Sequence, residues 1–204
     1  TPQWEITGPE ASAEDVMTLH TGGTERMRID TSVKFDNLAG LTTNGNVTIT
    51  PNGTGIFVPK KVPAFRAEKR SGNQTISGGQ PKITFEHETF DIGGNYDTSN
   101  SRFTAPVDGI YFFQSQLRMV GDNQTLDYGK VMLFINGSIN SDLFQFNVRS
   151  DYMQNSHVNG SCLVQLSASD YVEINTEMSG NNPLIHGHSG GARTYFTGHL
   201  VSGT

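Results

Sequence analysis

The residue pattern with the clearest potential for chemistry is the His-Gly-His motif formed by His186 and His188. Residues two apart in an extended chain project to the same side, so the two imidazoles would point together. Imidazole nitrogens bind transition metals, and three copies of the chain around an axis would each contribute this pair. His186 and His188 are therefore candidate ligands of a divalent transition metal, with a solvated Gly-rich loop as the competing interpretation.

Three residues with oxygen donors, Asp91, Asn95 and Asp97, could serve calcium instead. They lack the ordered spacing of an EF-hand loop, so ordinary loop polarity explains them equally well. The Glu-His-Glu stretch at residues 86–88 combines acid–base groups, but on a strand its histidine would face away from both carboxylates. Neither group predicts a specific reaction.

The sequence offers little support for an enzyme. It contains no His-Glu-x-x-His motif and no phosphate-binding glycine loop. The single cysteine, Cys162, lies in the apolar run GSCLVQL, which is typical of a small buried strand residue. We therefore predict a protein that is not an enzyme and has no certain cofactor, a divalent metal being the one candidate.

Charge and hydropathy exclude two classes of partner. The formal net charge is -6 and no long run of Lys and Arg occurs, which argues against nucleic acid. No apolar stretch approaches the roughly 18 residues of a membrane span, so membrane insertion is not expected.

The elements that would position these residues are strands. Helical periodicity is nearly absent, and short alternating segments are separated by Gly, Asn and Pro, which predicts an all-β fold. The alternating segment GIYFFQSQLRMV, residues 109–120, is one predicted strand. Asn-Gly pairs such as Asn136-Gly137 predict tight hairpin turns. A change in composition near residue 61 predicts two parts: a β-repeat shaft or attachment region at residues 1–61 and a sandwich or jelly roll at residues 62–204.

The low apolar content predicts a core that one chain does not complete by itself. Hydrophobic residues make up 34% of the chain, which also contains 23 glycines. We therefore expect other copies of the chain to complete the core around a shared axis. The aromatic residues expected in the core or at this trimer contact are Phe103, Tyr111, Phe113, Tyr195 and Phe196.

The second part of the chain resembles the C1q/tumour-necrosis-factor superfamily. The resemblance rests on a spaced series of residues: Phe85, Asp91, Tyr96, Phe103, Gly109, Tyr111 and Phe113. The segments VPAFRAEK, SCLVQLSASDYVEI and TYFTGHLV also look like blocks of that family, over about residues 62–202. The chain departs from the pattern at Ser115, where the family has an aromatic residue. The resemblance implies a jelly roll assembled as a homotrimer.

The first part resembles structural proteins of tailed bacteriophages, through TGGTERMRID and NVTITPNGTG. Together the two resemblances imply a virion protein: a trimeric fibre or appendage that contacts other virion proteins through its first part and a host-surface glycan or protein through its head. The expected contact loops are residues 121–128, 151–157 and 179–191. A capsid-decorating protein and a secreted or spore-surface C1q-like binding module remain alternatives.

Overall fold

The structure is a computed structural model that describes residues 54, 61–121, 126–148, 153–191 and 193–203. Its named elements are all strands: β1 (Ala64–Glu68), β2 (Gln74–Thr75), β3 (His87–Ile92), β4 (Tyr96–Asp97), β5 (Arg102–Thr104), β6 (Gly109–Val120), β7 (Leu126–Ile135), β8 (Ser138–Asn147), β9 (Asn155–Leu166), β10 (Tyr171–Gly180), β11 (Leu184–Ile185) and β12 (Tyr195–Gly203). The all-β prediction is confirmed. The β-repeat predicted for residues 1–61 lies almost entirely outside the described residues, so the two-part division stays a prediction.

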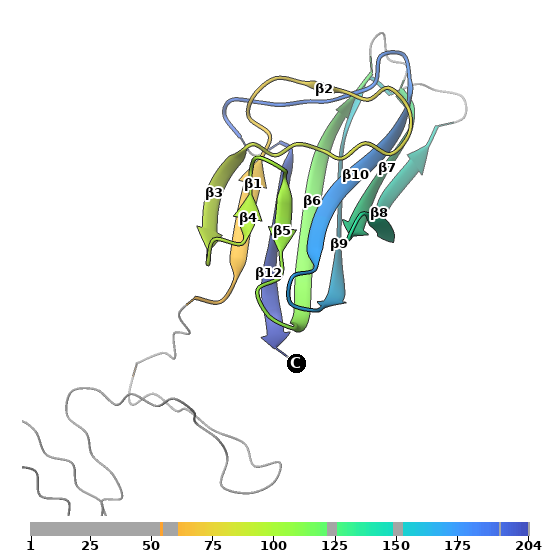
Figure 1. Cartoon of the computed structure of the whole chain (residues 1–204). Helices are drawn as coiled ribbons and strands as arrows, with labels where there is room; N and C mark the ends of the chain where they lie inside the picture. Colours follow the sequence, from red (N-terminus) through yellow and green to blue (C-terminus); the bar gives the residue numbers. More distant parts are fainter. Residues whose placement is uncertain (1–53, 55–60, 122–125, 149–152, 192, 204) are drawn as a thin grey trace, which may run out of the picture. The chain divides into compact units, whose positions relative to one another are not determined.

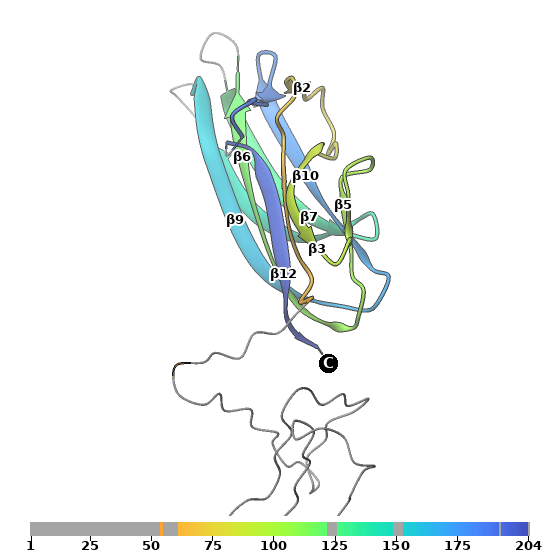
Figure 2. The same cartoon turned by 90° about the vertical axis from the view of Figure 1, so that its left-hand side faces the viewer.

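The strands form two antiparallel sheets that pack as a sandwich (Figures 1 and 2). The seven-stranded sheet runs β2-β11-β6-β12-β1-β3, and β9 pairs with the other side of β6. The five-stranded sheet runs β4-β5-β10-β7-β8. Neighbours that are distant in sequence, such as β1 and β12, show that the sheets close by long crossovers, as in a jelly roll.

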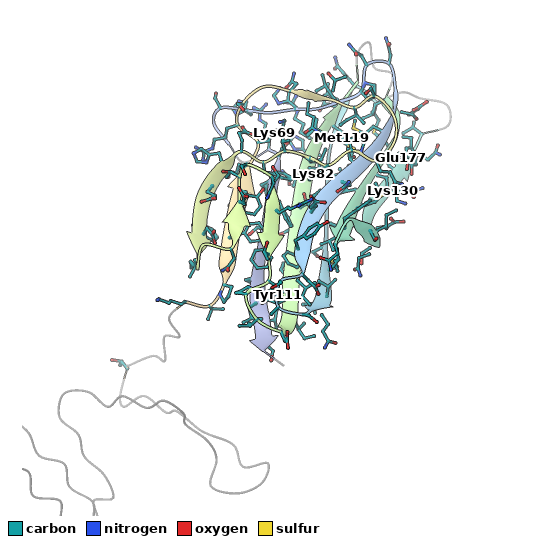
Figure 3. All side chains as sticks on the ribbon, viewed as in Figure 1. Lys69, Lys82, Tyr111, Met119, Lys130 and Glu177 are labelled. Atoms are coloured by element: carbon teal, nitrogen blue, oxygen red, sulfur yellow. The ribbon has the colours of Figure 1, made fainter. Side chains whose placement is uncertain are left out.

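The described domain begins and ends at the same end of the sandwich, which we call the proximal end (Figure 1). The backbone N–H of Leu200 donates to the carbonyl of Pro63 at 2.9 Å, just before β1 starts. At the same end Gly203 pairs with Gly109. The opposite end, near Met119 in Figure 3, is called the distal end.

Aromatic rings from both sheets meet around Phe65. Its ring stacks on Tyr96 at 4.8 Å and on Phe103 at 5.0 Å between centroids, and it meets Phe196 edge-on at 4.9 Å. These geometries are the preferred ones for aromatic pairs, which contribute about 0.5–1.5 kcal/mol each beyond their area burial. The core is therefore centred on one side chain of β1.

One expectation about this core is wrong. Phe103, Tyr111, Phe113 and Phe196 have no exposed surface in a single chain, so no neighbouring copy is needed to cover them. The modest apolar fraction suffices because apolar residues occupy the inward positions of alternating strands. Tyr195 differs: it is half-buried and lies 4.0 Å beneath the guanidinium of Arg66.

Two local predictions are confirmed in detail. The segment GIYFFQSQLRMV forms β6 over its whole predicted length, and its residues alternate between buried and half-buried. The turn at Asn136-Gly137 joins β7 to β8 with φ values of 52° and 79°, the left-handed pair that a type I′ hairpin requires.

A buried ion-pair cluster ties the connection between β2 and β3 to the five-stranded sheet. Glu173 on β10 accepts hydrogen bonds from Lys82 at 2.8 Å and from Arg102 at 2.6 Å. Burial opposes the charge of Glu173, but these two cations outweigh it and hold its pKa below the ordinary value. The carboxylate is thus better stabilised in the folded chain than in the unfolded one.

We predict that Phe65→Ala lowers the free energy of unfolding by about 3–5 kcal/mol, because the cavity would lie among several rings. The matched control Phe144→Ala removes a ring that is 38% exposed on β8, and it should change stability by less than about 1 kcal/mol. Equilibrium urea unfolding of both variants at one protein concentration measures the difference. Equal losses would contradict the placement of the core.

We also predict a pH signature for Glu173. A depressed pKa contributes stability above the unfolded-state value near 4.3, and this stability is lost as pH falls through the folded-state pKa. Glu173→Gln should therefore lower the free energy of unfolding by about 1–3 kcal/mol at pH 7. The difference in this free energy between variant and parent should become smaller below about pH 4. Urea unfolding of both proteins at several pH values measures this difference. A difference that does not change with pH would contradict the stabilised carboxylate of Glu173.

Candidate functional site

The outer face of the seven-stranded sheet, which is turned away from the five-stranded sheet, carries an apolar row near the proximal end. Strand register aligns Ile92, Ala64, His199, Phe112 and Leu163 across β3, β1, β12, β6 and β9 in that order. Leu163 is 60% exposed and Ile92 is 46% exposed. The rings of Phe112 and His199 lie 5.4 Å apart.

This apolar row is the candidate assembly site of the domain. Phe90 on β3 and Val201 at the end of β12 add further exposed apolar surface near it. Contiguous exposed apolar patches mark interaction surfaces, whereas apolar residues exposed singly are common and carry no such meaning. The row can bury apolar area against a second surface, and it holds no groups arranged for catalysis.

The polar loops expected to contact a host gather at the distal end. The N–H of Gly121 donates to the carbonyl of Gln154 at 3.0 Å, which joins the first loop to the second. Val120 pairs with Leu184 on one side and with Asn155 on the other, which brings the third loop beside them. Of these loops, residues 122–125 and 151–152 lie outside the described residues.

His186 and His188 lie in the third loop and do face the same way. Their ring centroids are 6.3 Å apart with an interplanar angle of 27°. Nδ1 of His188 accepts a hydrogen bond from the N–H of Gly190 at 3.1 Å, so Nε2 carries the proton of this ring. Within the described residues, no group of three or more His, Cys, Asp or Glu side chains is placed to hold a metal. A metal here would need ligands from other copies, and the metal site stays a prediction.

The same loop contains the Gly-x-Ser-x-Gly sequence pattern of a serine nucleophile. Residues 187–191, GHSGG, match Gly-x-Ser-x-Gly. In hydrolases this pattern works because the serine sits on a sharp turn from a strand into a helix. Here it lies in the connection from β11 to β12, between two strands. The pattern therefore lacks the local structure that would activate Ser189.

The other polar candidates bind the protein's own backbone. Asp91 accepts from the N–H of Tyr96 at 2.9 Å, and Asp97 accepts from the N–H of Ser99 at 2.8 Å. These carboxylates cap local turns. Asn95 lies in the same connection, and calcium binding by these residues stays a prediction.

Residues 86–88 and Cys162 also have structural surroundings. Glu86 accepts from the N–H of Arg70 at 2.7 Å and from the N–H and hydroxyl of Ser71, while His87 contacts the guanidinium of Arg70 at 3.1 Å. Cys162 is half-buried on β9, and burial raises the pKa of its thiol. A raised pKa disfavours the reactive thiolate.

Comparison with known families now bears on the fold. The family model of the C1q domain matches residues 64–201, more than half of the chain. The chain belongs to the C1q domain family. The chain departs from the spaced aromatic pattern of the family at Ser115. The Ser115 side chain is buried, and its hydroxyl donates to the carbonyl of Tyr195 at 2.9 Å. A small hydroxyl residue thus ties β6 to β12 where the series would place a ring.

Two curated relatives come from Bacillus subtilis (strain 168). The chain is 30% identical over 98 residues to the uncharacterized protein YqcC, covering 46% of this chain and 26% of the relative. It is also 30% identical over 128 residues to the phage-like element PBSX protein XkdV, covering 59% of this chain and 18% of the relative. The C1q chain thus spans about a quarter or less of the length of these relatives.

Among solved structures, the tumour necrosis factor Eiger from S. frugiperda has the same fold. Its TM-score to this chain is 0.53 at 10% identity, covering 71% of this chain and 96% of that one. At this identity the likeness concerns the fold alone. The described residues contain no helix that is long and apolar enough to cross a membrane.

Proposed function

We propose that this C1q chain is a non-enzymatic structural protein of a phage or phage-like particle, which assembles as a homotrimer and attaches the particle to a host surface. The particle is supported by the similarity of the chain to a protein of the phage-like element PBSX. The non-enzymatic role is supported by the described polar side chains of Asp91, Asp97 and Glu173, which are engaged in caps and ion pairs.

The apolar row is the single observation that carries the assembly. Leu163 and Ile92, at its two ends, remain largely exposed although the core of the same chain is complete. Burying apolar surface contributes roughly 25 cal/mol per Å², so an uncovered row favours association. A second and third copy that present the same row around an axis would cover it symmetrically.

Attachment would then take place at the distal end. Its three polar loops lie at the opposite end of β6 from the row, and assembly through the row would leave them open. Three identical loop sets on one axis turn weak contacts with a surface glycan or protein into strong overall binding. Residues 1–61 would contact other virion proteins.

We predict that the purified full chain has a mass about three times 22.2 kDa by light scattering. Leu163→Asp places a charge in the row and should shift the chain to the monomer, because the carboxylate would have to be desolvated in the interface. Ile139→Asp is the matched control, since Ile139 is 49% exposed on the five-stranded sheet. Circular dichroism verifies that both variants fold. A monomeric parent chain would rule out the trimer.

The place in the particle can be tested by electron microscopy with antibodies against this chain, on particles purified from the source culture. Label at tail appendages is the expected result and supports host attachment. Label across the capsid shell would instead identify a capsid-decorating protein. Chain found only in the culture fluid or on spores, with unlabelled particles, would overturn the proposal in favour of a cellular C1q-like module.

A further inference from the structure

Basic side chains from three segments, β6, β9 and the connection between β11 and β12, lie close together at the distal end. Arg118 on β6 pairs in register with His157 on β9, so their side chains share this face. The N–H of His186 donates to the carbonyl of Arg118 at 2.9 Å. Arg193 directly precedes Thr194, which is buried beside these residues. We call Arg118, His157, His186 and Arg193 the cationic cluster.

The hydroxyl of Thr194 fixes the geometry of this cluster. It accepts from the N–H of Arg118 at 3.1 Å and donates to the carbonyl of His186 at 2.8 Å. The side-chain amide of Gln116 donates a hydrogen bond from Nε2 to the carbonyl of Arg193 at 3.1 Å. The backbones that carry the charges are therefore cross-linked by hydrogen bonds, and a site on them would be preorganised.

The cluster lacks the compensation that other cations of the domain have. Arg66 and Arg70 each bond to Glu68 at 2.9 Å, and Arg102 bonds to Glu173. Within the described part of the chain, neither Arg118 nor Arg193 has a carboxylate in ion-pair range. This is notable in a chain whose net charge is -6, because carboxylates are in excess elsewhere.

Two nitrogen atoms in the cluster also lack a partner. Nε of Arg118 and Nδ1 of His186 are shielded from solvent and make no hydrogen bond within the protein. Buried polar atoms are almost always paired with protein or ordered water, so these two nitrogens are positions that a ligand or a water molecule can occupy.

We propose that the cationic cluster binds a small oxyanion of the phosphate type. The two guanidinium groups provide charge and forked donors that match phosphate oxygens, and the imidazole of His186 can donate from its unpartnered side. The anion could be free or could be a phosphate group esterified to a larger molecule, since the chemistry recognised is the same. The site lies within one chain, so it requires neither the trimer nor the particle.

Isothermal titration of the full chain with inorganic phosphate at low ionic strength tests this site. We expect saturable binding with one site per chain, although the net negative charge of the chain opposes any nonspecific uptake of anions. Arg118→Gln should weaken the binding about tenfold or more, because it removes a charge-assisted contact. Arg193→Gln provides a second variant in case the first does not fold.

Titration with glycerol phosphate distinguishes a free anion from an esterified one. Equal affinity for both compounds indicates an open site that accepts esters, and binding of inorganic phosphate alone indicates a closed one.

Lys130→Gln is the matched control, because it removes one positive charge from the five-stranded sheet, where Lys130 pairs with Asp142 at 2.9 Å. This variant should bind phosphate as the parent does. The proposal is overturned if the parent shows no saturable binding, or if all three variants lose affinity equally. Either outcome would leave the trimer intact in light scattering, so failure of the anion site is distinguishable from failure of the proposed function.

Discussion

The packing of aromatic rings between the two sheets is the constraint on which the rest of the domain depends. Phe65 contacts rings from both sheets, among them Phe103 and Phe113, which lie 5.5 Å apart. Because side chains alternate along a strand, fixing these rings inward fixes their neighbours outward. Phe113 inside requires Phe112 outside, and Gly198 must be a glycine because any Cβ there would collide with the Phe113 ring.

The outer face therefore inherits its character from the register of the core. The row of paired residues at the proximal end is apolar. Farther toward the distal end, the paired residues Gln114 and Ser161 are polar, and the paired residues Arg118 and His157, next to Met119, are basic. The two proposals assign association to one end of this sheet and ligand contact to the other.

The sequence was informative where structure is local. Alternation predicted β6 to the residue, and the Asn136-Gly137 turn followed from the positive φ values that its residues tolerate. Sequence reasoning failed where pairing is long-range. Low apolar content suggested an open core, but composition does not reveal how well apolar residues are placed. Arg118 and Arg193 gave no signal because 75 positions of sequence separate them, and only the pairing of β6 with β12 brings their segments together.

The hydrogen bond between Leu200 and Pro63 has an evolutionary consequence. It places the two ends of the described C1q fold side by side. A gene segment that encodes such a fold can be transferred between long proteins without altering the path of the recipient backbone.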